Sequence, residues 1–324
     1  MGHTGDALIP GIEWEITTRC NYRCSYCSQK QYSSLLWKDC SDEVVESVYE
    51  ILRGSGEPWL VKLAGGEPFI HPRFLEICRW LVESSHRVCT TTNFSAPERK
   101  LDEFISATGD SLEYVVASLH PSQVKNIDSY IEKARYFQSA KNPATKFTVT
   151  SVAVEENMDV LKYAASRLTE YGIRFEVAPL KENGNYVEPE SSEFSEFAGR
   201  WVLKSVKEIK RLRSMGTVCH TGRKFCRITA EGDVLRCYNL QPLMYMGNVK
   251  DGTFSWFDSV KPCLALKCTC TVPANRNLIE FGNVLPVYET VKQYNAALMH
   301  NIPGILQLSG KWAGRSLKNI LTRK

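Results

Sequence analysis

The chain has 324 residues, 43% of them hydrophobic and 23% charged, as in a globular protein that buries a sizeable core. Its 40 basic and 36 acidic residues leave a net charge of only +4, which excludes the strongly basic surface of a dedicated nucleic-acid-binding protein. No apolar run approaches the roughly 18 residues of a membrane span, and the N-terminal residues lack the pattern of a signal peptide, so we expect a cytoplasmic protein.

Six segments with the apolar pattern of a strand run through the first two thirds of the chain, each followed by a segment with helical spacing. The strand-like segments are residues 12–17, 59–64, 88–93, 114–119, 147–154 and 175–179. The helix-like stripes are residues 44–52, 74–81, 101–105, 127–137, 161–168 and 201–212, the second opening at Pro72. Repetition of strand and then helix predicts a parallel sheet covered by helices, an α/β fold.

Two motifs stand at the ends of the first two strands. Cys20, Cys24 and Cys27 follow the first strand in a C-x3-C-x2-C spacing. Such a group of thiolates holds a metal or an iron–sulfur cluster, and in a four-iron cluster three cysteines leave one iron open. A three-cysteine zinc site and chance clustering are the alternatives. The second strand ends in 65–68, Gly-Gly-Glu-Pro, where the glycines allow close approach of the backbone to a ligand.

The triplet and the Gly-Gly-Glu-Pro motif, in this order and at these strand ends, resemble the radical S-adenosylmethionine (radical SAM) superfamily. The resemblance implies a partial (β/α)6 TIM-like barrel and a 4Fe–4S cluster bound by Cys20, Cys24 and Cys27. It also implies that S-adenosyl-L-methionine (SAM) chelates the open iron and is cleaved to a 5'-deoxyadenosyl radical. An external reductant such as flavodoxin or ferredoxin would supply the electron. The radical then abstracts a hydrogen atom from an unactivated carbon.

The resemblance also indicates which residues contact SAM. The candidates are Tyr26, Gly65, Gly66, Glu67, Asn93 and Ser118. In relatives the backbone and acid of the Gly-Gly-Glu motif meet the methionine ammonium, an aromatic residue before the last cysteine lies near the adenine, and polar strand ends face the ligand. Barrels of this type bind ligands at the C-terminal ends of their strands. Thr92, His120 and Asn157 also follow or end strands, but turn and capping roles explain such residues equally well.

A second group of cysteines lies in the last third of the chain: Cys219, Cys226, Cys237, Cys263, Cys268 and Cys270. The segment 219–237 holds two short strands around a Glu-Gly-Asp turn, which predicts a β-hairpin. Cysteines at both its ends, with Gly232 between them, resemble the opening of the SPASM and twitch extensions of radical SAM enzymes. The Gly-Asn step at 247–248 resembles a feature found downstream in those extensions.

Too few cysteines remain for a two-cluster SPASM module, so we expect a single auxiliary 4Fe–4S cluster of the twitch kind. Its expected ligands are Cys219 and Cys237 together with two of Cys263, Cys268 and Cys270. Cys263 with Cys268 is slightly favoured, because the geometry is tight when both thiolates of the C-x-C pair, Cys268 and Cys270, bind one cluster. A structural zinc site would use the same ligand types and stays open.

The remaining cysteines are expected to be packed in the protein interior, and one of them has a possible role in the reaction. Cys226 is expected to be a packed thiol or a hydrogen-atom donor to the substrate, as in radical epimerases of this subfamily. Cys40, Cys78 and Cys89 lie in or beside helix and strand patterns and are expected in the core.

We therefore expect a radical SAM barrel over 1–215, an auxiliary cluster domain over 216–282 and a helical extension over 283–324 that ends in a short basic amphipathic segment. The first strand begins about a dozen residues from Met1, so we expect no leader-peptide domain before it. This favours a small-molecule or sugar substrate that is oxidised or epimerised, the reaction of an oxidoreductase or epimerase. A peptide or protein maturase and a non-catalytic iron–sulfur or zinc-binding protein are the alternatives.

Overall fold

The computed structural model describes residues 9–27, 37–182, 185–201, 214–238, 244–266 and 276–290, together with residues 268, 272, 292, 306 and 309. The chain forms two compact units. We call Ile16–Asp39 with Val61–Lys204 the strand–helix unit. We call Met1–Glu15, Cys40–Leu60 and Ser205–Lys324 the cysteine-rich unit. The boundary between the two units falls inside the first strand, after Glu15, and directly after the first residue of the second strand, Leu60.

The strand–helix unit is built on a run of strands in the order β2-β3-β4-β5-β6. These are β2 (Leu60–Gly65), β3 (Arg87–Thr92), β4 (Leu112–Leu119), β5 (Lys146–Val152) and β6 (Arg174–Ala178). The pairs β3–β4, β4–β5 and β5–β6 are parallel. A short hairpin, β7 (Lys181–Glu182) with β8 (Asn185–Tyr186), follows β6.

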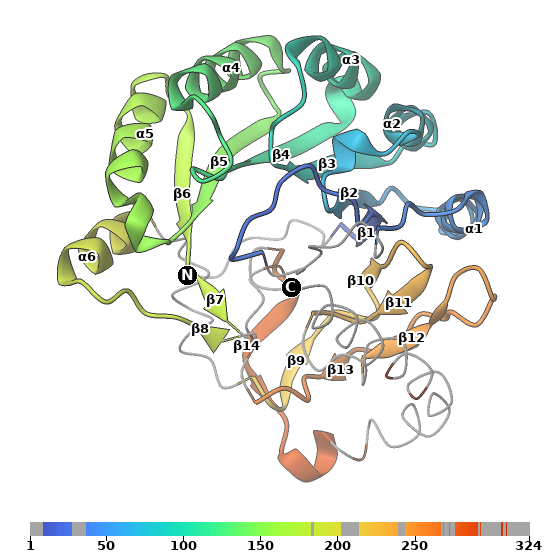
Figure 1. The fold of residues 1–324 in the computed structure, drawn as a ribbon. Helices are drawn as coiled ribbons and strands as arrows, with labels where there is room; N and C mark the ends of the chain where they lie inside the picture. The colour runs from blue at the N-terminus through green and yellow to red at the C-terminus, as the bar shows by residue number, and fades with distance from the viewer. Residues whose placement is uncertain are drawn as a thin grey trace. The chain divides into compact units, whose positions relative to one another are not determined.

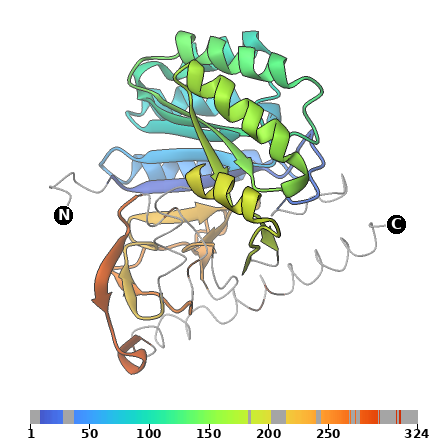
Figure 2. The same ribbon diagram turned by 90° about the vertical axis from the view of Figure 1, so that its left-hand side faces the viewer.

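Helices lie on the outer side of these strands (Figure 1). They are α2 (Phe74–Glu83), α3 (Glu98–Thr108), α4 (Ile127–Ala140), α5 (Met158–Glu170) and α6 (Ser192–Trp201). Figure 2 shows the same unit turned by 90°, with α4 and α5 running alongside the strands. The α/β fold class, a parallel sheet covered by helices in the manner of a partial TIM-like barrel, is thereby confirmed.

The apolar stripes seen in the sequence are the faces that pack on the sheet. In α2 the buried residues are Phe74, Ile77, Cys78 and Leu81, the same four that the spacing indicates. The helix begins two residues after Pro72, because a 3-10 turn at Pro68–Ile70 first carries the chain away from β2. Aromatic rings fill the core beneath, where Phe69 and Phe74 have centroids 4.4 Å apart. Each fully buried ring of this size contributes about 2–3 kcal/mol.

The cysteine-rich unit contains two groups of hydrogen-bonded strands and α1 (Asp42–Arg53). One has the order β12-β11-β10-β1, formed by β12 (Tyr245–Asn248), β11 (Asp233–Leu235), β10 (Phe225–Ile228) and β1 (Gly11–Thr17). The other has the order β13-β9-β14, formed by β13 (Lys261–Pro262), β9 (Thr217–Cys219) and β14 (Ile279–Val284). The expected hairpin is confirmed, since β10 and β11 are antiparallel and Gly232 turns between them with φ +84°.

The Gly-Asn step after the hairpin has a packing reason. A Cβ on Gly247 would lie 2.3 Å from the Thr253 carbonyl oxygen, and its φ of +110° favours glycine. The Asn248 amide donates to Glu231 O at 3.0 Å and to Asp233 Oδ1 at 2.9 Å. The step thus fixes β12 against the hairpin turn.

In the part of the chain that the structure describes, no helix has the length and apolarity needed to cross a membrane. The expected helix over 201–212 is described only to Trp201, the last residue of α6. The rest of that segment and the basic segment at the C-terminus lie outside the described residues.

Candidate functional site

The three cysteines of the triplet lie in the loop that leaves β1 in the strand–helix unit. Cys24 is buried and Cys20 and Cys27 are half-buried; none forms a disulfide. The Cys27 amide donates to Cys24 O at 3.1 Å, so the last two cysteines stand on one turn. Burial, and after it the neighbouring Cys27 and Cys20, raise the pKa of Cys24 to about 11. A bound cationic iron or metal would favour the thiolate forms that this crowding disfavours, so the donor set fits a thiolate-ligated cluster.

The Gly-Gly-Glu motif at the end of β2 lies directly against the start of this loop. The amides of Gly66 and Glu67 donate to Thr17 O at 2.8 Å and to Arg19 O at 2.7 Å. A Cβ on Gly66 would lie 1.9 Å from Arg19 O, so only glycine permits this approach. The motif therefore packs its main chain beside the residue that precedes Cys20.

The Glu67 carboxylate is fully buried and faces β3. Its Oε1 accepts from Phe69 N at 3.1 Å and from Thr92 Oγ1 at 2.8 Å, and its Oε2 accepts from Asn93 N at 2.6 Å. Burial raises the pKa of Glu67 to about 7, and these hydrogen bonds oppose the shift. The carboxylate thus braces the ends of β2 and β3 against each other. From the sequence we expected this acid to contact a ligand; its contacts with the end of β3 were not predicted.

Asn93 connects the end of β3 to the cysteine loop. Its Nδ2 donates to Asn21 Oδ1 at 2.8 Å and lies 3.8 Å from Cys20 Sγ. Its Oδ1 accepts from Ser95 N at 2.9 Å. The structure therefore brings together Cys20, Glu67 and Asn93, three of the residues singled out in the sequence.

Tyr26 meets the end of β4 through His120. The Tyr26 hydroxyl and His120 Nδ1 are 3.0 Å apart, and the two rings have centroids 5.7 Å apart. Burial lowers the pKa of His120 to about 4 and raises that of Tyr26, so both side chains are neutral near pH 7. Ser118 is half-buried on β4, opposite Thr150 of β5. Asn157 lies just before α5.

Sequence reasoning missed the residues that close the base of the cysteine loop. Thr17 Oγ1 donates to Asp39 Oδ1 at 2.6 Å, and Arg19 forms an ion pair with Asp39 Oδ2 at 2.8 Å. Thr18 N donates to Lys38 O at 2.7 Å. These contacts fasten the two ends of the loop together. Thr17 and Arg19 stand beside the triplet in the sequence, but Asp39 belongs to no motif.

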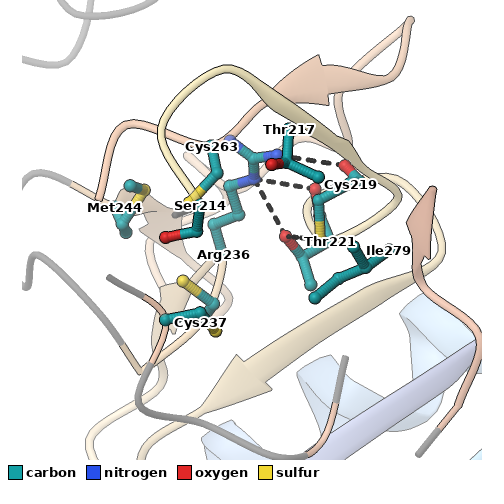
Figure 3. Close-up of a pocket in the computed structure, with 10 residues that line it drawn as sticks. Ser214, Thr217, Cys219, Thr221, Arg236, Cys237, Met244, Cys263 and Ile279 are labelled. Carbon is teal, nitrogen blue, oxygen red and sulfur yellow. Dashed lines mark hydrogen bonds between the residues drawn. The ribbon is translucent and has the colours of Figure 1, made fainter. Parts of the chain in front are cut away.

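A second cysteine site lies within the cysteine-rich unit, where four thiols line one pocket (Figure 3). The pocket residues are Ser214, Thr217, Cys219, Thr221, Arg236, Cys237, Met244, Cys263, Cys268 and Ile279. Burial raises the pKa of Cys263, and the nearby positive charge of Arg236 opposes the shift. The two expected ligands and the two favoured partners thus share one pocket.

The other cysteines lie elsewhere. Cys226 is fully buried on β10, opposite Ile12 of β1, and is not among the pocket residues. Cys40, Cys78 and Cys89 are buried, as expected. Cys270 lies outside the described residues.

Ligands of a single metal ion converge to within about 2.3 Å of one point. Among the described residues, no three His, Cys, Asp or Glu side chains are grouped in this way. The four thiols of the second site therefore line one pocket without forming an assembled ion site.

Comparisons with known proteins agree on one family. Residues 14–167 match the family model described as the radical SAM superfamily. The "AdoMet-dependent heme synthase" of Methanosarcina barkeri is 30% identical over 98 residues, covering 30% of this chain and 28% of the relative. A "GTP 3',8-cyclase" of Chlorobaculum tepidum is 28% identical over 151 residues, covering 45% of this chain and 44% of the relative. The chain thus spans less than half the length of these curated relatives.

A solved structure supports the fold. The structure of the tagged protein "anSMEcpe with bound AdoMet" has a TM-score of 0.52 and 16% identity, and the match covers 75% of this chain and 78% of that one. At this identity the likeness concerns the fold alone.

Proposed function

Since this chain is a member of the radical SAM superfamily and therefore an enzyme, we propose that Cys20, Cys24 and Cys27 bind a 4Fe–4S cluster at which SAM is reductively cleaved. The observation that carries the proposal is the packing of the Gly-Gly-Glu main chain against the loop that holds these three free thiols. When bound, the cluster and SAM supply a 5'-deoxyadenosyl radical after one electron enters from an external reductant such as flavodoxin or ferredoxin. Because these reductants are cytoplasmic proteins, we propose a cytoplasmic enzyme.

The residues around the triplet have distinct proposed roles. The amides of Gly66 and Glu67 donate to Thr17 O and Arg19 O and so hold the main chain of the motif in place. An ammonium group only donates, so the main-chain carbonyls of the motif are the groups proposed to accept from the methionine ammonium. Glu67 then acts through Asn93, which it holds by the main-chain amide at 2.6 Å. This assigns the acid a positioning role in place of the direct contact that the sequence suggested.

The aromatic side of the site is proposed to receive the adenosyl group. Tyr26 is held by His120, and both rings are neutral near pH 7. Neutral, half-buried rings offer flat apolar faces for an adenine at little electrostatic cost. Ser118, on the same strand end as His120, is proposed to lie near the ribose.

For the cysteine-rich unit we propose an auxiliary 4Fe–4S cluster held by Cys219, Cys237, Cys263 and Cys268, in a twitch-like domain over 216–282. Support comes from the single pocket that these four thiols line. Four soft thiolates suit a four-iron cluster with one ligand per iron, and they also suit zinc. The segment 283–324 is proposed to be an extension of this domain.

The proposed substrate is a small molecule or sugar, which is oxidised or epimerised after hydrogen abstraction from carbon. Support comes from the names of the curated relatives, a heme synthase and a GTP cyclase, which both denote small-molecule chemistry. A peptide or protein substrate is the alternative, and co-purification with a peptide would favour it.

Anaerobic reconstitution followed by iron counting and a SAM cleavage assay tests the proposal. We expect about eight irons per chain and release of 5'-deoxyadenosine and methionine after reduction. Cys24→Ala should lower the iron content by about four and abolish cleavage. A colourless protein that contains zinc and leaves SAM intact after reduction would overturn the enzyme mechanism proposed for the triplet.

A further inference from the structure

Thr221 is a pocket residue whose hydroxyl contacts one of the four thiols of the proposed auxiliary site. It lies just after β9, two residues from Cys219, and is only 3% exposed. Its Oγ1 lies 3.4 Å from Cys219 Sγ (Figure 3). A threonine hydroxyl can both donate and accept, so the direction of this hydrogen bond decides its effect on the thiol.

A neighbouring donor sets the direction in which the hydroxyl proton points. Arg236 Nε donates to Thr221 Oγ1 at 3.0 Å and to the Thr221 carbonyl oxygen at 2.9 Å. A guanidinium nitrogen donates and never accepts, so Thr221 Oγ1 is the acceptor in this hydrogen bond. The hydroxyl proton therefore points away from Nε, and Cys219 Sγ lies within hydrogen-bond distance to accept it.

Iron binding by Cys219 requires the same direction. A cysteine that binds iron has lost its proton, so its sulfur can only accept a hydrogen bond, and the Thr221 hydroxyl is then the donor. Cys263 Sγ accepts in a similar way from the main-chain amide of Ala265 at 3.4 Å. Two proposed ligands thus each have a donor at the sulfur, and the donor to Cys219 is a side chain that a substitution can remove.

We propose that Thr221 is a positioning residue that donates a hydrogen bond to the Cys219 thiolate and so raises the reduction potential of the auxiliary cluster. The inference rests on the auxiliary cluster proposed above. A thiolate-ligated four-iron cluster gains negative charge on reduction, and a donor at a ligand sulfur stabilises that charge. The reduced form therefore gains more from the hydrogen bond than the oxidised form does, which raises the potential.

The test compares Thr221→Val and Thr221→Ser in the full chain after anaerobic reconstitution. Valine keeps the branched shape of threonine and loses the hydroxyl, whereas serine keeps the hydroxyl. The Thr221 carbonyl oxygen still accepts from Arg236 in both variants, so we expect the wild-type iron content.

The readout is the midpoint potential of the auxiliary cluster, followed by electron paramagnetic resonance. The signal of this cluster is identified from Cys24→Ala, which lacks the triplet cluster. For Thr221→Val we expect a lower potential: the equilibrium constant for reduction falls about three- to tenfold, and a tenfold fall corresponds to about 59 mV for one electron. For Thr221→Ser we expect the wild-type potential, because the donor remains.

Thr229→Val is the matched control. Thr229 is a buried threonine of the same unit, between β10 and β11, and is not among the pocket residues. Its Oγ1 accepts from Asp233 N at 3.1 Å, so the substitution also removes a buried hydrogen bond. We expect the wild-type potential from it. The triplet cluster is the internal control, because its ligands belong to the other unit and should support SAM cleavage in every variant.

The outcomes separate the inference from the function on which it rests. A wild-type potential in Thr221→Val, or an equal shift in Thr229→Val, would overturn the inference. If Thr221→Val binds no auxiliary cluster, electron–nuclear double resonance of the wild-type protein decides after brief transfer to deuterated water, in which a hydroxyl proton exchanges before a buried amide does. A deuteron coupled to the auxiliary cluster supports the hydroxyl donor, and its absence overturns it. A protein whose iron content is unchanged by Cys237→Ala has no auxiliary cluster, and the proposed function of this unit then fails first.

Discussion

At the scale of single residues, Gly66 is the position where the fold admits no side chain. Its Cβ would lie 1.9 Å from the Arg19 carbonyl oxygen, which is main chain and cannot turn away. We expect Gly66→Ala to push the motif away from the cysteine loop, at a cost of about 1–3 kcal/mol, and to weaken SAM binding at least tenfold. Thermal unfolding and equilibrium binding of SAM to the reconstituted protein measure both effects.

Gly199 in α6 provides the control for this substitution. A Cβ there meets nothing within 4 Å, so Gly199→Ala should be neutral or stabilising by about 0.5–1 kcal/mol. Equal effects of the two substitutions would contradict the steric argument.

The carboxyl of Glu67 should make stability depend on pH. Its pKa is raised to about 7 from an ordinary value of 4.5, so the folded protein holds a proton that the unfolded chain releases between these pH values. The contribution of Glu67 to the free energy of unfolding, about 3 kcal/mol, is fully present below about pH 4.5. It is lost as the pH rises through 7. Glu67→Gln cannot ionise and should lack this part of the pH dependence in denaturant unfolding. A variant with the wild-type slope would refute the assignment.

Of the two roles that the sequence allows for Cys226, packed thiol and hydrogen donor, we expect the packed thiol. Its thiol is fully buried on β10 and lies outside the pocket of the four thiols, so we expect Cys226→Ala to keep the iron content and to give the same product. Product analysis by mass spectrometry in deuterated water measures this. A changed product or a lost deuterium label would instead establish the donor role.

At the scale of elements, the loop between β1 and α1 depends on contacts at its base. Asp39 joins Thr17 and Arg19, and the ion pair is partly exposed, so it contributes at most about 1 kcal/mol to global stability. We expect Asp39→Asn to leave the unfolding temperature almost unchanged and to slow cluster loading several-fold, because the loop ends are less firmly held. The time course of iron incorporation is the measurement.

Glu76→Gln is the matched control for the loop. Glu76 pairs with Arg73 on α2, and its ion pair is likewise partly exposed. Loading slowed equally by both variants would mean that lost surface charge, and not the loop closure, is responsible.

At the scale of the whole molecule, the two proposed clusters draw their ligands from different units. We therefore expect independent loading: Cys24→Ala should keep the auxiliary cluster, and Cys237→Ala should keep the triplet cluster and reductive SAM cleavage, with about four irons in each variant. Mössbauer or paramagnetic resonance spectra of the two variants should sum to that of the wild type. Joint loss of both clusters in either variant would show that the sites assemble together.

Three features could be predicted from the sequence alone: the order of strands and helices, the faces that pack and the two groups of thiols. These features follow from periodicity and spacing along the chain, as in the four buried residues of α2 or the hairpin around Gly232. The cysteine triplet and the Gly-Gly-Glu motif could also be paired from sequence, because parallel strands end at the same edge of a sheet.

The directions of the side chains at the two sites could not be predicted from the sequence and become visible only in the folded chain. The Glu67 carboxylate turns toward Thr92 and Asn93, Asp39 closes a loop that begins twenty residues earlier, and Arg236 reaches carbonyls of two other segments. Such contacts join residues far apart in the chain, and they depend on strand register and close packing. Neither is encoded in the local pattern of apolar and polar residues, because that pattern specifies which face is buried and not which partner it meets.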